Sequence, residues 1–228
     1  MIRRNIALIP AAGVGARFGA GKPKQYVEIN GKTVLQHTIE IFEQHPRIDL
    51  IAVILSPEDS VFQTALSEKV RVFRVGGASR AETVRNGVST LLEQGLAEAQ
   101  DNILVHDAAR CCLPAEALTR LLDEAEESNE GGILAIPVAD TLKRADGSHH
   151  IDETVARAGL WQAQTPQLFQ TALLNRALSV DDLSEITDEA SAVEKLGIRP
   201  RLVQGDTRNL KLTLPQDEYI VILLLKAV

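Results

Sequence analysis

Apolar, strand-like runs alternate along most of this chain with segments that are apolar at helical spacing. The strand-like runs cover residues 6–9, 50–55, 70–75, 102–106 and 132–138. Between them, residues 34–42, 84–92 and 118–125 repeat apolar side chains three or four positions apart, which places those side chains on one face of a helix. Strands that alternate with helices predict an α/β fold whose sheet is mostly parallel and covered by helices on both faces.

This alternation breaks after Asp140. Residues 141–152 are polar, as expected for a hairpin, and residues 154–163 are expected to return as its second strand. No internal repeat, low-complexity segment or linker divides the chain. We therefore predict a single Rossmann-like domain over residues 1–228, with a β-arm excursion at about 141–163.

The composition excludes several classes of protein. The chain has 228 residues, of which 45% are hydrophobic, and its mean hydropathy of −0.01 is ordinary for a globular domain. A formal net charge of −7 argues against non-specific binding to nucleic acid, which requires a basic surface. The apolar stretch at 219–225 is too short to cross a membrane, and Pro10 interrupts the N-terminal apolar run too early for a secretory signal. Cys111 and Cys112 are adjacent and cannot form an ordinary disulfide, which favours a reducing cytoplasm.

A glycine-rich segment follows the first strand-like run, and two cations follow the glycines. Gly13 and Gly15 permit a close approach of the backbone to a ligand, so amide N–H groups can bind phosphate oxygens. Arg17 and Lys24 add positive charge for the same anion, and together these residues predict a nucleoside triphosphate site. A tight turn with solvated cations would also explain the glycines. A dinucleotide-binding turn is disfavoured because Phe18 stands where its third small residue belongs, and the chain has no G-x-x-x-x-G-K-[ST] phosphate loop.

Asp107 and Arg110 follow the fourth strand-like run, at the sheet edge where ligands bind in folds of this class. A carboxylate there can hold a divalent cation on a triphosphate, and Arg110 can bind a second phosphate. The alternative is that Asp107 caps the following helix.

Three further segments allow both a functional and a structural interpretation. The Gly77 backbone and the Thr83 hydroxyl could read the edge of a base, but the same segment also has the pattern of a capping box at a helix start. Thr187 stands at a predicted helix cap that is followed by acidic residues. Lys211 lies in an apparent closing strand, residues 209–213, whose alternation would point the side chain toward solvent.

Together, these segments resemble the 2-C-methyl-D-erythritol 4-phosphate cytidylyltransferase family of the non-mevalonate isoprenoid pathway. The likeness runs in order through nearly the whole chain. The matching motifs are P-A-A-G-x-G-x-R at 10–17, P-K-Q-Y at 23–26, G-G-x-x-R at 76–80, V-H-D-A-A-R at 105–110, D-T-x-K-R at 140–144, L-W-x-A-x-T-P-Q at 160–167, T-D-E-A-S-A at 187–192 and N-x-K-x-T at 209–213.

The resemblance implies transfer of CMP from CTP to 2-C-methyl-D-erythritol 4-phosphate, with release of pyrophosphate and with Mg²⁺ or another divalent cation as cofactor. It implies catalytic roles for Arg17, Lys24 and Lys211, and a metal site at Asp107. Nucleotide binding is implied for Pro10, Ala11, Ala12, Gly13, Gly15, Gly77, Thr83, Asp107 and Ala108. Binding of the methylerythritol phosphate is implied for Asp107, Arg110, Thr141, Arg157, Thr187 and Lys211. Thr141 and Arg157 would come from the arm of a partner subunit in a cytoplasmic homodimer.

Two residues depart from the family pattern: Thr83 replaces a usual serine, and Cys111 replaces a usual proline. The implied chemistry is an in-line attack of a phosphate oxygen on the α-phosphorus of CTP. It needs no general base because that phosphate is already ionised at neutral pH. Ribitol-5-phosphate cytidylyltransferase shares most of these loops and remains an alternative. A non-catalytic nucleotide-binding protein is a third possibility, which the joint presence of Arg17, Lys24, Asp107 and Lys211 disfavours.

Overall fold

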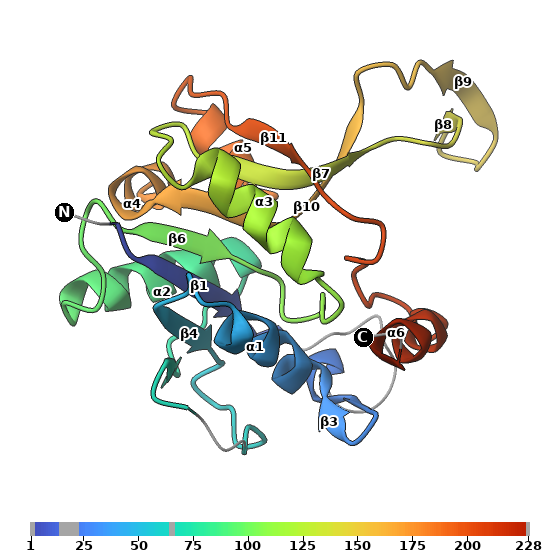
Figure 1. The fold of residues 1–228 in the computed structure, drawn as a ribbon. Helices are drawn as coiled ribbons and strands as arrows, with labels where there is room; N and C mark the ends of the chain where they lie inside the picture. The colour runs from blue at the N-terminus through green and yellow to red at the C-terminus, as the bar shows by residue number, and fades with distance from the viewer. Residues whose placement is uncertain (1–2, 14–22, 64–66, 227–228) are drawn as a thin grey trace.

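The computed structural model describes residues 3–13, 23–63 and 67–226, and its centre is a seven-stranded sheet (Figure 1). The strand order is β11-β7-β10-β6-β1-β4-β5, and β10 alone runs antiparallel to its neighbours. The mostly parallel sheet predicted from the sequence is therefore confirmed. The strands are β1 (Asn5–Pro10), β4 (Leu50–Ile54), β5 (Val70–Phe73), β6 (Asn102–Val105), β7 (Gly132–Pro137), β10 (Trp161–Gln170) and β11 (Arg201–Gln204).

Helices cover both faces of this sheet (Figure 1). Ala7 and Ile9 of β1 pack in one core cluster with α1 and α3, whereas Ile6 and Leu8 pack in a second cluster with α2, α4 and α5. This division follows from the two-residue period of a strand. The helices are α1 (Val34–Gln44), α2 (Arg80–Glu93), α3 (Ala115–Ala125), α4 (Thr171–Leu178), α5 (Glu189–Glu194) and α6 (Asp217–Lys226), and a 3₁₀ turn, η1, covers Lys24–Tyr26. No helix among the described residues is long and apolar enough to span a bilayer.

Four parallel strands deliver their carboxyl ends to one edge of the sheet. Residues 11–13 follow β1, Gly76 and Gly77 follow β5, and Asp107 is the second residue after β6. Gly76 donates its N–H to Leu55 O at 2.8 Å, and a Cβ at Gly76 would lie 2.3 Å from the Cβ of Ala12. Only glycine therefore lets the loops after β1, β4 and β5 meet this closely.

The excursion differs from the prediction at its C-terminal end. β8 (Leu142–Ala145) pairs with β9 (Ile151–Val155), and Figure 1 shows this two-stranded ribbon extending away from the rest of the fold. Residues 161–163, expected in the returning strand, instead pair with β7 in the central sheet. The chain turns between them, because Leu160 N–H bonds Arg157 O at 3.0 Å and Gly159 has a φ of +77°. We call residues 141–160 the arm.

A second difference concerns residues 209–213, which form no strand. The Asn209 side chain is fully buried and donates to Thr165 O at 2.7 Å, while Leu212 N–H bonds Ala109 O at 2.9 Å. These single contacts fasten the segment across the carboxyl edge of the sheet. The alternation of apolar and polar residues that suggested a strand therefore arises from separate contacts of individual residues with neighbouring loops.

Candidate functional site

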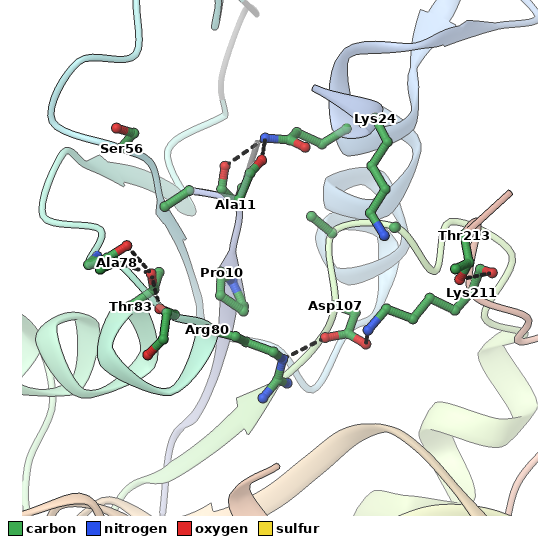
Figure 2. Close-up of a pocket in the computed structure, with 17 residues that line it drawn as sticks. Pro10, Ala11, Lys24, Ser56, Ala78, Arg80, Thr83, Asp107, Lys211 and Thr213 are labelled. Carbon is green, nitrogen blue, oxygen red and sulfur yellow. Dashed lines mark hydrogen bonds and ion pairs between the residues drawn. The ribbon is translucent and has the colours of Figure 1, made fainter. Parts of the chain in front are cut away.

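A pocket of about 610 Å³ opens at the carboxyl edge of the sheet, where segments distant in the sequence converge (Figure 2). Its walls come from the loop after β1, from η1, from the start of α2, from the loop after β6 and from the 209–213 segment. The lining residues are Pro10, Ala11, Ala12, Gly13, Lys24, Gln25, Ser56, Gly77, Ala78, Ser79, Arg80, Thr83, Asp107, Ala108, Ala109, Lys211 and Thr213.

The loop after β1 is shaped by a buried amide. The Gln25 side chain donates to Ala11 O and Gly13 O, both at 2.9 Å. Ala11 N–H is bonded to Ile54 O at 2.8 Å. Of the residues that the structure describes, none would lie within 4 Å of a Cβ at Gly13, so none of them blocks the approach of an anion to this backbone.

The segment before α2 is a helix start, as one of the two interpretations predicted. The Ser79 side chain accepts from Glu82 N–H at 3.1 Å, and the Glu82 carboxylate accepts from Ala78 N–H at 2.8 Å. Thr83 Oγ1 accepts from Gly77 N–H at 3.1 Å and donates to Ser79 O at 2.9 Å. The Thr83 hydroxyl thus fixes the position of the Gly77 loop at the pocket wall.

Asp107 is the carboxylate at the centre of the pocket's charges (Figure 2). Its Oδ1 accepts from Arg80 Nε at 2.8 Å, and its Oδ2 lies 2.9 Å from Lys211 Nζ and 3.5 Å from Arg110 Nε. Burial alone would raise the pKa of Asp107, but the cations outweigh burial and hold that pKa well below its usual range. The helix-cap interpretation was wrong, because α3 begins only at Ala115, with Pro114 at its N-cap position.

Arg80 also pairs with a second carboxylate, that of Glu189. Its two terminal nitrogens bond the Glu189 oxygens at 2.7 and 3.1 Å, in addition to the bond from Nε to Asp107. Glu189 is only 1% exposed, and burial raises its pKa despite the opposing effect of Arg80. Asp188 caps α5 in a capping box with Ser191, so the predicted helix start is confirmed but its cap is Asp188 and not Thr187.

His106 supports the Asp107 loop without reaching the pocket. Because the Arg110 carbonyl can only accept, His106 Nε2 donates to it at 3.0 Å, and Nδ1 accepts from the Thr165 hydroxyl at 3.0 Å. Thr165 Oγ1 in turn accepts the Asp107 N–H at 3.1 Å. Complete burial lowers the pKa of His106 to about 4, so the ring is neutral at pH 7.

Lys24 and Lys211, which are distant in the sequence, both line the pocket. Lys24 Nζ donates to Leu212 O at 3.1 Å, next to Lys211 in the chain. Lys211 does not lie in a strand, and although its side chain is 39% exposed, its ammonium pairs with Asp107 at 2.9 Å. Among the described residues that line the pocket, the cations are thus Lys24, Arg80 and Lys211, and the carboxylate is Asp107 (Figure 2).

Most of the predicted site residues converge, and some do not. The pocket is lined by Pro10, Ala11, Ala12, Gly13, Lys24, Gly77, Thr83, Asp107, Ala108 and Lys211. Arg110 contacts Asp107 from beside the pocket. Thr141 and Arg157 are exposed on the arm, and Thr187, which is also exposed, bonds Ser191 instead of lining the pocket. Gly15 and Arg17 lie outside the described residues.

The sequence predicts no role for Arg80 or Gln25, and for Glu189 it predicts only a favourable interaction with a helix dipole. All three lie within motifs that the sequence analysis identified. Arg80 follows the glycine pair, Glu189 belongs to the segment that begins at Thr187, and Gln25 follows Lys24. Nothing local signals that Arg80 meets a carboxylate 109 positions later. The burial of Gln25 and Glu189 could not be predicted, because burial depends on which loops the fold brings together.

Comparisons with known proteins identify relatives along the whole chain. The family model described as IspD, 2-C-methyl-D-erythritol 4-phosphate cytidylyltransferase, matches residues 5–226. The cytidylyltransferase of that name from Neisseria meningitidis serogroup A / serotype 4A is 70% identical over 231 residues and all of both chains. The enzyme of that name from Chromobacterium violaceum is 51% identical over 93% of each chain.

Solved structures agree with these sequence relatives. A crystal structure of 4-diphosphocytidyl-2C-methyl-D-erythritol synthase is 63% identical, with a TM-score of 0.89 over 99% of this chain and 100% of that one. The Francisella tularensis 2-C-methyl-D-erythritol 4-phosphate cytidylyltransferase is 32% identical, with a TM-score of 0.82 over 97% and 99% of the two chains.

Proposed function

The chain belongs to the 2-C-methyl-D-erythritol 4-phosphate cytidylyltransferase family, and we propose that its pocket transfers CMP from CTP to 2-C-methyl-D-erythritol 4-phosphate. The products are 4-diphosphocytidyl-2-C-methyl-D-erythritol and pyrophosphate, in non-mevalonate synthesis of isoprenoid precursors. One observation carries the proposal: a single pocket holds an open glycine loop, two lysines and a buried carboxylate from four distant segments. The free cysteines Cys111 and Cys112 are consistent with a reducing cytoplasm as the site of action.

CTP would lie along the loop after β1, with its base toward the start of α2. The backbone of residues 10–13 is suited to phosphate and ribose, and the Gly77 loop, held by Thr83, is suited to the edge of the base. Gly15 would add to the phosphate contacts. Ala108 borders the same space beside Asp107. Lys24 and Arg17 would bind the triphosphate.

The reaction is an in-line attack by the 4-phosphate oxygen on the α-phosphorus of CTP. Negative charge gathers on the attacking, equatorial and leaving oxygens, so the residues of the site must hold two anions together and stabilise this charge. Lys24 and Lys211, which border the pocket, and Arg17 supply positive charge for that purpose. The attacking phosphate already carries its negative charge at neutral pH, so no residue has to remove a proton.

Asp107 would hold the divalent cation. Among the described residues no cluster of three His, Cys, Asp or Glu side chains could bind a metal alone, so one carboxylate must be completed by substrate oxygens and water. Mg²⁺ accepts such a site, with one or two carboxylates and the phosphates of the substrate as ligands. When bound, the ion neutralises charge on the phosphates. The three cations around Asp107 keep its carboxylate ionised and ready for this role.

The methylerythritol phosphate would bind on the other side of Asp107, at Arg110, Thr187 and Lys211. Thr141 and Arg157 would reach this site from the arm of a second copy in a homodimer. The arm supports this arrangement, because an isolated two-stranded ribbon is marginal in water and Ile151 on β9 is 67% exposed. A partner surface would both order the arm and cover this apolar side chain.

The function is tested by pyrophosphate release from CTP with 2-C-methyl-D-erythritol 4-phosphate or ribitol 5-phosphate, each with Mg²⁺. We expect release with the first acceptor and with CTP in preference to ATP, GTP or UTP. Faster release with ribitol 5-phosphate would identify the alternative cytidylyltransferase. Tight CTP binding without pyrophosphate release from either acceptor would identify a non-catalytic nucleotide-binding protein.

The shared site is tested by mixing two inactive variants, Arg157→Ala and Lys24→Ala. In a hybrid dimer one site keeps Lys24 and borrows an intact Arg157, so activity should rise after subunit exchange. No gain despite exchange, measured with differently tagged subunits, would contradict a site built from two copies. Glu153→Gln on the same arm, where Glu153 pairs with Arg144 at the surface, is the control and should keep its activity.

A further inference from the structure

We propose that Arg80, held by Glu189, is a positioning residue that fixes the Asp107 carboxylate for CMP transfer, while Lys211 is the cation that leaves this carboxylate to bind phosphate. The inference rests on the proposed function, because it assigns Asp107 a part in the transfer. Neither Arg80 nor Glu189 needs to touch a substrate for this role.

The contacts of Arg80 show why it stays in place. Three of its nitrogens are engaged, Nε by Asp107 at 2.8 Å and the two terminal nitrogens by Glu189 at 2.7 and 3.1 Å. A planar guanidinium with a two-point contact to one carboxylate has its orientation fixed by that contact. Glu189 cannot easily move, since it is 1% exposed and begins α5 in the core.

Lys211 is bound to the same carboxylate in a different way. Its side chain is 39% exposed, and its ammonium makes one contact, to Asp107 Oδ2 at 2.9 Å. Figure 2 shows Arg80 and Lys211 reaching Asp107 from opposite sides, Arg80 from the start of α2 and Lys211 from the 209–213 segment. A lysine on a flexible stem can exchange one oxygen for another, whereas Arg80 would have to break three bonds.

The charges of the cluster favour such an exchange. Three cations, Arg80, Arg110 and Lys211, surround the single carboxylate of Asp107, so Lys211 can bind an anion while the other two still pair with Asp107. When the Lys211 ammonium moves from Asp107 Oδ2 to a phosphate oxygen, Arg80 Nε still donates to Oδ1 of Asp107. The freed Oδ2 then keeps a defined direction into the pocket.

Removing both partners of the Arg80–Glu189 ion pair together distinguishes a structural role of Arg80 from a positioning role. Losing one partner leaves a buried charge unpaired and destabilises the fold, but replacing both with apolar side chains of similar size is often neutral. The test variant is therefore Arg80→Met combined with Glu189→Met. The matched control is Lys195→Met combined with Glu185→Met, which removes an ion pair of 2.7 Å on the surface.

For the double variant at Arg80 and Glu189 we expect a melting temperature close to that of the wild type. We expect kcat to fall about 10- to 100-fold, as when residues that orient a reacting group are lost, with the KM for CTP nearly unchanged. The control variant should match the wild type in all three quantities. A stable double variant with normal kcat would overturn the proposal. If the double variant does not fold, the test uses Arg80→Lys instead, because lysine keeps the charge but lacks the planar guanidinium. A normal kcat of Arg80→Lys would then overturn the proposal.

A crystal structure of the double variant without substrates makes the test independent of the proposed function. Asp107 should leave its wild-type rotamer or occupy several, and an unchanged Asp107 carboxylate would contradict the positioning role. Failure of the wild-type protein to transfer CMP would instead reject the proposed function, while the position of Asp107 would still report on Arg80.

Discussion

His106 makes the stability of this protein sensitive to mild acid. The ring is fully buried against Phe42, at 5.1 Å between ring centroids, and both nitrogens are bonded inside the protein. Burial lowers its pKa to about 4, whereas a histidine in the unfolded chain titrates near 6.5. Between pH 4 and pH 6.5, therefore, His106 is protonated in the unfolded chain but neutral in the folded protein.

The sign of the effect follows from this difference. Above pH 6.5 neither state is protonated at this ring, and His106 contributes no pH dependence. As pH falls from 6.5 toward 4, protonation stabilises only the unfolded chain, so the free energy of unfolding decreases. The loss amounts to about 2 kcal/mol at pH 5 and about 3 kcal/mol at pH 4.

The comparison of wild type with His106→Gln isolates this contribution, because other titrating groups are shared by both proteins. Urea unfolding at pH 7.5, 6, 5 and 4 gives the free energy of each. At pH 7.5 the variant should be less stable, since it loses part of the hydrogen bonding between Thr165 and Arg110. The difference should shrink by about 3 kcal/mol on going to pH 4. A difference that stays constant over this range would refute a buried, neutral His106.

Three further substitutions test the pocket. Lys24→Ala should lower kcat about 100-fold, equivalent to about 3 kcal/mol, and change the Kd for CTP far less; a normal kcat with a raised KM for CTP would contradict the role. Asp107→Asn should abolish the response of the rate to Mg²⁺ while circular dichroism stays unchanged, and a wild-type response would remove Asp107 from the metal site. Gly76→Ala should destabilise the fold by about 1–3 kcal/mol in urea, because its Cβ would lie 2.3 Å from Ala12 Cβ. Gly147→Ala is its control, since a Cβ there meets nothing within 4 Å.

The sequence predicts best what short-range patterns determine. Apolar runs such as residues 50–55 become strands that are buried on both faces of the sheet, and Ser79 caps α2 as predicted because the capping bond is local. The start of α5 was also predicted, but its cap lies one residue later than expected, at Asp188. The loops after β1 and β6 reach one pocket because parallel strands end at the same edge.

Long-range contacts account for what the sequence analysis got wrong. The alternation in 209–213 looks like a strand, but the segment is fixed by the buried Asn209 amide and by single bonds to neighbouring loops. Lys211 is partly exposed, as expected, but its ammonium pairs with Asp107 from a distant loop, which no local pattern indicates. Glu189 resembles an ordinary acidic residue after a cap until Arg80 is placed beside it.

Isotope transfer tests the central claim, that this pocket performs nucleotidyl transfer. The protein is incubated with 2-C-methyl-D-erythritol 4-phosphate, Mg²⁺ and CTP labelled with ³²P at either the α- or the γ-phosphate, and the products are separated. The account predicts that the α label appears in the cytidyl product of the alditol phosphate and the γ label only in pyrophosphate. Transfer of the γ label to the acceptor, or no transfer of the α label, would contradict it.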